Sequence, residues 1–254
     1  MIQKTKLIVA NWKMNPETEQ EAKNLIEEVK VGLISIKNIK TVVCPPFIFI
    51  DSVKKNLGKT KNLILGAQDA FVGDGSSHTG EVGLEMLKKI GAKYIIIGHS
   101  ERRDECDTDE SIANKTYAVL KNNLKTILCV GEKERSEHGE HYNEIKKQLL
   151  TALSKIQKRY IKNLIVAYEP VWAIGKKDNE AINSEHLFEM TIFIKKILSD
   201  LLGHDIAKKI PLIYGGSVNK NNAKELLENG KVDGLLVGRE SLKIKNFIDM
   251  IKSL

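Results

Sequence analysis

The sequence predicts a closed α/β barrel of eight strand–helix units, a (β/α)8 barrel. Short apolar runs, each about the length of one strand, alternate with amphipathic segments along all 254 residues. The runs are apolar throughout, which is typical of parallel strands that are covered on both faces. No linker, low-complexity tract or shift in composition separates the units. We therefore expect one domain over residues 1–254.

The predicted strands are short and evenly distributed. They are Leu7–Ala10, Thr41–Cys44, Leu63–Ala67, Tyr94–Gly98, Thr126–Val130, Leu164–Tyr168, Pro211–Tyr214 and Gly234–Val237. A doubly wound open sheet is the alternative fold. It has less support because no Gly-x-Gly-x-x-Gly follows the first strand.

Three segments between the strands carry an apolar stripe at helical spacing. The stripes are Ala22, Leu25, Ile26, Val29 and Leu33; Ile145, Leu149, Leu153 and Ile156; and Leu187, Met190, Ile194, Ile197 and Leu201. For the first helix we expect Asn15 as the N-terminal cap and Pro16 at the first helical position.

Composition indicates an ordinary globular protein, with 42% hydrophobic and 29% charged residues. No apolar run is long enough to span a bilayer, and the first residues run directly into a strand, so we expect neither a membrane partner nor a secretory signal. Cys44, Cys106 and Cys129 are isolated, which predicts a reducing, cytoplasmic location and no metal site. The net charge of +7 is spread among glutamates, which favours a solvated surface over a nucleic-acid site.

The segment from Leu164 to Gly175 carries the clearest functional signal. A buried strand ends at Glu169, and Pro170 prevents the strand from continuing. The next residues are apolar up to Gly175, although loops are usually polar. Such a segment fits a lid that excludes water. The alternative is an ordinary turn with an exposed Glu169.

In a barrel of this kind the residues that follow each strand meet at one end. The chemically useful ones are Asn11 and Lys13 after the first strand, His99 after the fourth, Glu169 after the sixth, Gly215, Gly216 and Ser217 after the seventh, and Gly238 and Arg239 after the eighth. Gln68 and Asp69, after the third strand, are interpreted as loop-shaping residues.

Together these groups suit proton abstraction beside a carbonyl in a phosphorylated substrate. Glu169 would be the base and Lys13 a fixed cation. His99 would lie at the start of a helical turn, where the helix dipole disfavours the imidazolium. The glycine-rich turns after the last two strands suit phosphate binding through backbone N–H groups. Each group also has a plain structural interpretation, as an exposed lysine, a hydrogen-bonded histidine or a simple turn.

Four segments resemble the signature segments of the triosephosphate isomerase family. They are Asn11-Trp12-Lys13-Met14-Asn15, Gly98-His99-Ser100-Glu101-Arg102-Arg103, Tyr168-Glu169-Pro170-Val171-Trp172-Ala173-Ile174-Gly175 and Tyr214-Gly215-Gly216-Ser217. Their order and spacing match the family from about Lys6 to the C-terminus, and each follows a predicted strand.

The resemblance implies the interconversion of dihydroxyacetone phosphate and D-glyceraldehyde 3-phosphate through an enediolate, as in glycolysis and gluconeogenesis; this family is a standard example of such chemistry. By resemblance, Glu169 is the base and neutral His99 the electrophile. Lys13 and Asn11 stabilise the oxyanion. No metal or organic cofactor is implied.

The resemblance also assigns binding and supporting roles. It implies phosphate binding by backbone N–H groups of Gly175, Ser217, Gly238 and Arg239. It implies a lid hinge at Pro170 to Trp172, a charge from Glu101 near Lys13, and a contact from Glu132 to Trp172 in the open lid.

The family resemblance further implies a homodimer in which Thr79-Gly80-Glu81 reaches the partner. Three stretches of the sequence depart from the family pattern. Lys176-Lys177 replaces Thr-Gly in the lid, Cys106-Asp107-Thr108 replaces an aromatic-Gly-Glu segment, and Arg239 replaces a second glycine. An arginine still has an N–H to donate at that position.

Two other functions compete with this interpretation. An aldolase would need a Schiff-base lysine inside the barrel, whereas Lys93 and Lys125 lie at the starts of predicted strands, the wrong end. An inactive scaffold barrel would be expected to lack Lys13, His99 or Glu169, and the sequence has all three.

Overall fold

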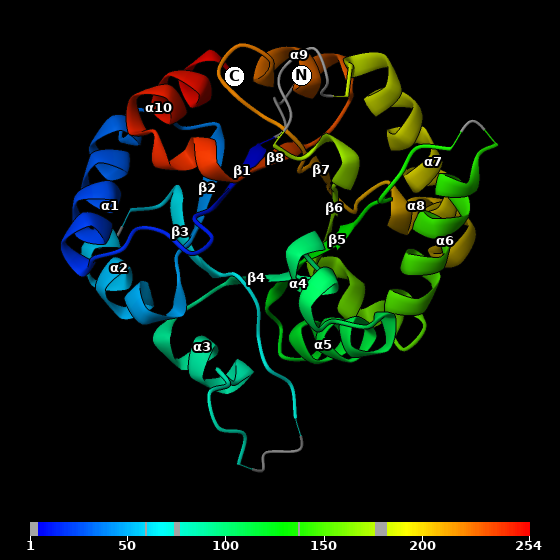
Figure 1. The fold of residues 1–254 in the computed structure, drawn as a ribbon, viewed down its shortest axis with the longest axis horizontal. Helices are drawn as coiled ribbons and strands as arrows, with labels where there is room; N and C mark the ends of the chain where they lie inside the picture. The colour runs from blue at the N-terminus through cyan, green and yellow to red at the C-terminus, as the bar shows by residue number, and fades with distance from the viewer. Residues whose placement is uncertain (1–4, 59, 74–76, 137, 176–181) are drawn as a thin grey trace.

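The computed structural model describes residues 5–58, 60–73, 77–136, 138–175 and 182–254. Eight parallel strands form a closed barrel in chain order, with β8 paired to β1 (Figure 1). The strands are β1 (Lys6–Asn11), β2 (Ile39–Cys44), β3 (Leu63–Ala67), β4 (Tyr94–Ile97), β5 (Lys125–Val130), β6 (Leu164–Tyr168), β7 (Leu212–Tyr214) and β8 (Gly234–Val237). The (β/α)8 prediction is confirmed, with strand ends shifted by one or two residues.

Helices surround the strands as an outer ring (Figure 1). They are α1 (Glu19–Leu33), α2 (Ile50–Leu57), α3 (Leu84–Ile90), α4 (Ser100–Glu105), α5 (Asp109–Lys121), α6 (Glu140–Leu153), α7 (Ser184–Leu202), α8 (His204–Ala207), α9 (Ala223–Asn229) and α10 (Ile244–Ser253). Short 3-10 helices are η1 (Phe47–Phe49), η2 (Lys158–Asn163), η3 (Val171–Ala173) and η4 (Arg239–Leu242).

The core has two parts because successive strand residues point to opposite faces. One set fills the barrel, for example Val9 from β1 and Ile96 from β4. The alternate set, for example Ile8 and Ile97, packs with the helices. This double burial explains why the strand sequences are apolar throughout.

The first helix begins later than predicted. α1 starts at Glu19, and its cap is Thr18, whose hydroxyl accepts a hydrogen bond from Glu21 N at 3.2 Å. The Glu21 carboxylate in turn accepts one from Thr18 N at 3.2 Å. This reciprocal capping box satisfies two otherwise unpaired N–H groups. Asn15 therefore does not cap the helix, and Pro16 lies before it.

The predicted helical stripes are buried in most positions. In α7, Leu187, Met190, Ile194 and Ile197 are buried, but Leu201 is exposed. Leu202 is buried in its place, about one helical turn after the buried Leu198.

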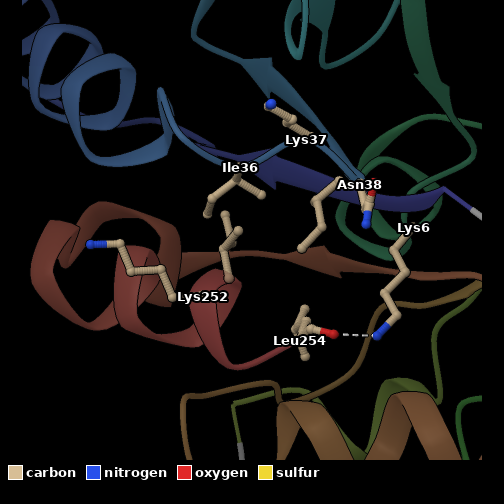
Figure 2. A pocket seen from close by; sticks show the side chains of 8 residues that line it. Lys6, Ile36, Lys37, Asn38, Lys252 and Leu254 are labelled. Carbon is tan, nitrogen blue, oxygen red and sulfur yellow. Dashed lines mark hydrogen bonds between the residues drawn. The ribbon is translucent and has the colours of Figure 1, made fainter. Parts of the chain in front are cut away.

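A cavity of about 220 Å³ lies at the N-terminal end of the barrel, beside the starts of β1 and β2 (Figure 2). Lys6 Nζ donates a hydrogen bond there to the Leu254 carbonyl. Its lining includes Lys37 and Lys252, and none of the described residues that line it carries a carboxylate or imidazole side chain. The candidate catalytic residues follow the opposite ends of the strands.

Candidate active site

The mouth of the barrel brings Glu169 and His99 together from β6 and β4. Glu169 Oε1 lies 3.7 Å from His99 Nε2. Both residues are buried, with 2% and 7% of their surfaces exposed. Their proximity follows from the closed parallel barrel, which places the carboxyl ends of distant strands at one rim.

Close backbone packing fixes the position of Glu169. Its N–H donates to Val130 O at 2.8 Å, which extends the pairing of β5 and β6 by one residue. A Cβ on Gly131 would lie only 1.8 Å from Glu169 O. A Cβ on Gly215 would lie 2.7 Å from Glu169 Cγ. Gly131 therefore leaves room for the Glu169 backbone, and Gly215 leaves room for its side chain.

The Glu169 carboxylate is incompletely paired. Ser100 N donates to Oε2 at 3.3 Å. Oε1 is buried and accepts no hydrogen bond from any residue that the structure describes. Burial, followed by the charge of Glu169, raises the pKa of the nearby Cys129 thiol well above its usual value. A buried carboxylate oxygen with no partner is suited to accept a proton from a bound molecule.

The orientation of His99 determines which ring nitrogen can donate. His99 caps α4, where its Nδ1 accepts a hydrogen bond from Glu101 N at 3.2 Å. A neutral ring that accepts this hydrogen bond at Nδ1 has its N–H at Nε2, the nitrogen that faces Glu169. The prediction that His99 lies at the start of a helical turn is confirmed.

Lys13 is held in an unusual backbone conformation, with φ of 54°. Its N–H donates to Asn11 Oδ1 at 3.0 Å, and its carbonyl accepts from Gln68 Nε2 at 2.8 Å. The ammonium forms a 2.5 Å ion pair with Glu101. A Cβ on Gly238 would lie 3.4 Å from Lys13 Cε, so the lysine side chain lies beside the turn after β8.

The apolar segment after β6 is held against Glu132, which has no exposed surface. Trp172 Nε1 and Tyr168 OH donate to Glu132 Oε1 at 2.7 and 3.0 Å. Ser217 Oγ donates to Ala173 O at 2.8 Å. The expected contact between Glu132 and Trp172 is therefore present. Lys176 and Lys177 lie outside the described residues.

Four backbone N–H groups lie around the turns after β7, β8 and the apolar segment. They belong to Gly175, Ser217, Gly238 and Arg239. In the described part of the chain, none of them donates a hydrogen bond. Such unpaired N–H groups beside glycine-rich turns suit an anion. Gly216 has a different role, since a Cβ there would lie 2.1 Å from Tyr214 OH.

Sequence reasoning missed a buried ionic cluster behind the site. Lys115 Nζ lies 2.8 Å from both Asp69 and Asp107, and Arg102 Nε donates to Asp69 at 3.1 Å. Burial opposes the charge of Lys115, but the two carboxylates raise its pKa overall. The sequence signal for this cluster is Lys115, a lysine on the apolar face of α5.

The residues described above contain no set of three His, Cys, Asp or Glu side chains that could hold a metal ion. Cys44, Cys106 and Cys129 are free. Within the same residues, no helix is long and apolar enough to cross a membrane.

The fold and the site define a (β/α)8-barrel enzyme with a carboxylate and an imidazole facing each other at its mouth. The family model of triosephosphate isomerase matches residues 6–254. A triosephosphate isomerase of Alkaliphilus oremlandii (strain OhILAs) is 38% identical over 247 residues, which are 96% of this chain and 98% of that protein. The chain belongs to the triosephosphate isomerase family, and its enzyme class is that of an intramolecular isomerase.

Proposed function

We propose that this enzyme interconverts dihydroxyacetone phosphate and D-glyceraldehyde 3-phosphate by moving one proton between adjacent carbons. The main observation behind the proposal is the buried Glu169 carboxylate. Its Oε1 has no hydrogen-bond partner among the described residues and lies 3.7 Å from His99 Nε2. The substrate's own carbonyl accepts the electron pair, so we propose no metal or organic cofactor.

Glu169 is the general base in this proposal. Its carboxylate removes a proton from the carbon next to the carbonyl, forming an enediolate, and returns the proton to the neighbouring carbon. Neutral His99 donates a hydrogen bond from Nε2 to the carbonyl oxygen and transfers protons between the two substrate oxygens. The bond from Glu101 N to Nδ1 supports this tautomer.

Lys13 and Asn11 stabilise the developing oxyanion. The ammonium is fixed by its ion pair with Glu101, and Asn11 supports the Lys13 backbone. A fixed cation needs little reorganisation when charge develops on the substrate.

The phosphate is bound by the N–H groups of Gly175, Ser217, Gly238 and Arg239. All four are unpaired within the described residues, which supports this role. Pro170 to Gly175 form the start of a lid that closes over the substrate and excludes water. The Glu132–Trp172 bond belongs to its open position.

We further propose that residues 1–254 form one domain, and that the enzyme is a cytoplasmic homodimer serving glycolysis and gluconeogenesis. Thr79, Gly80 and Glu81 are exposed on a segment that extends away from the ring (Figure 1). Met14, on the loop after β1, is 91% exposed, and Ile48, in η1 after β2, is 81% exposed. Large exposed apolar side chains favour a protein interface. No nucleic-acid or membrane partner is proposed.

A coupled assay of glyceraldehyde 3-phosphate conversion tests the function. We expect turnover without added metal or cofactor, also in the presence of a chelator. An aldolase is less favoured, because Lys125 starts β5 and Lys93 precedes β4. Cleavage or condensation in place of isomerisation would contradict the proposal.

A further inference from the structure

Arg239 occupies the first position of η4, directly after Gly238 at the end of β8. Its side chain extends toward the apolar segment that follows β6. A Cβ built on Gly175 would lie 2.9 Å from Arg239 Nη2. The guanidinium therefore lies beside Gly175, whose φ is 73°, in the space that a side chain at this position would occupy.

This guanidinium has no carboxylate partner among the residues that the structure describes. Each of the other four arginines has a partner. Arg102 pairs with Asp69, Arg103 with Asp109 and Arg135 with Glu189, and Arg159 lies over the Tyr160 ring. The adjacent Glu240 is instead engaged by Lys243 and Asn246, both at 3.0 Å.

The unpaired charge lies beside the unpaired N–H groups. Gly175 and Arg239 each contribute one of these groups, and Lys13 lies against Gly238 on the same turn. Glu101 compensates the Lys13 charge at 2.5 Å, whereas the Arg239 charge has no carboxylate partner within the described part of the chain. An exposed guanidinium favours the close approach of a dianion and matches phosphate geometry with two parallel N–H donors.

We infer that the Arg239 side chain is a phosphate-recognition element of this isomerase, in addition to the backbone N–H proposed above. In this inference the guanidinium binds oxygens of the substrate phosphate, on the side of the phosphate that faces Gly175. The inference rests on the proposed function, since it assigns a further contact to the same phosphate. Phosphate recognition would then depend on the charge of the Arg239 side chain as well as on the backbone N–H groups.

The test separates the side chain from the backbone, because Arg239→Ala keeps the N–H group. Binding of inorganic phosphate is measured by titration calorimetry, and KM and kcat are measured with glyceraldehyde 3-phosphate. For Arg239→Ala we expect Kd and KM to rise about tenfold, as for loss of one charge-assisted contact. We expect kcat to fall by less than about threefold, because the contact is made equally in the ground and transition states.

Arg239→Lys should give intermediate values, since a lysine keeps the charge but not the paired donors. Lys252→Ala is the matched control. It removes the same charge at the opposite end of the barrel (Figure 2) and should leave Kd and KM unchanged. Increased salt should weaken phosphate binding more in the wild type than in Arg239→Ala.

An unchanged phosphate Kd in Arg239→Ala would overturn the inference. So would a loss of kcat with KM and Kd unchanged, because the side chain would then act on the lid alone. A wild type that binds phosphate through Arg239 but does not turn over triose phosphate would refute the proposed function and leave the anion site supported.

Discussion

Lys13 adopts a left-handed backbone conformation that costs a residue with a side chain about 1–2 kcal/mol. Gln68 compensates for this locally, because its amide donates to both Lys13 O at 2.8 Å and Cys44 O at 2.9 Å. The ends of β1, β2 and β3 are thereby connected at the point where the ammonium is positioned. The sequence indicated only a loop-shaping role for Gln68. Its partners, Lys13 and Cys44, are far apart from it in the chain, and the strained backbone of Lys13 cannot be recognised from residue types.

Gln68→Ala should therefore reduce activity as well as stability. We expect the free energy of unfolding to fall by about 1–3 kcal/mol and kcat/KM by about tenfold through displacement of Lys13. Chemical denaturation and the coupled assay measure the two effects. Gln20→Ala, on the exposed side of α1, is the control. An unchanged kcat/KM would show that Gln68 does not position Lys13.

Tyr214 leads to a prediction about how the stability of the protein depends on pH. Its hydroxyl is buried without a hydrogen-bond partner among the described residues, and burial, followed by the charge of Glu132, raises its pKa. Above pH ~10 a tyrosine ionises in the unfolded chain while Tyr214 stays neutral in the folded protein, so stability is lost as the pH rises.

Tyr214→Phe should change the free energy of unfolding at pH 7 by less than about 1 kcal/mol. Between pH 10 and 11 the variant should lose less stability than the wild type, by up to about 1.4 kcal/mol. Urea denaturation at each pH measures the difference. Parallel stability curves for the two proteins would contradict the expected pKa shift.

At the scale of elements, strands were easier to predict than helix ends. A strand covered on both faces must be apolar along its whole length, and all eight strands were found from this pattern. A helix start depends on a few side-chain bonds. Asn15-Pro16 is a common start signal, but Thr18 and Glu21 form the reciprocal pair that actually begins α1.

Thr18→Ala should remove that cap and lower the free energy of unfolding by about 1 kcal/mol. Asn15→Ala should have a much smaller effect, because within the described residues the Asn15 side chain makes a single, long hydrogen bond, to Trp12 O at 3.5 Å. Thermal unfolding compares the two variants directly. An equal loss of stability in the two variants would contradict the assignment of Thr18 as the residue that caps and stabilises α1.

At the scale of the whole molecule, the closed barrel brings residues from separate parts of the chain together in one site. Strand order alone predicted that Asn11, His99 and Glu169 would lie at one rim. It could not predict where side chains from separate segments approach one another, such as Arg239 beside Gly175 or Lys115 between Asp69 and Asp107. These contacts depend on how far each side chain reaches, which the strand pattern does not contain.

The proposed homodimer is tested by placing a charge on the exposed side of the first loop. Met14→Glu should shift the oligomer toward monomer at micromolar concentration and lower the activity, because a charge buried in an apolar interface is unfavourable. Light scattering measures the mass. Val31→Glu, on α1, is the control, since Val31 is also exposed at 68%. A wild type that is fully active as a monomer would contradict the dimer.

The most direct test of the central claim is kcat of Glu169→Gln in the coupled assay, with folding checked by circular dichroism. The amide keeps the size of the side chain but cannot accept the proton, so we predict a folded protein with kcat lowered about 10²- to 10⁴-fold. Glu134→Gln, an exposed glutamate on the loop after β5, removes the same charge and should keep normal turnover. A Glu169→Gln variant that retains more than about a tenth of wild-type kcat would contradict the assignment of Glu169 as the base.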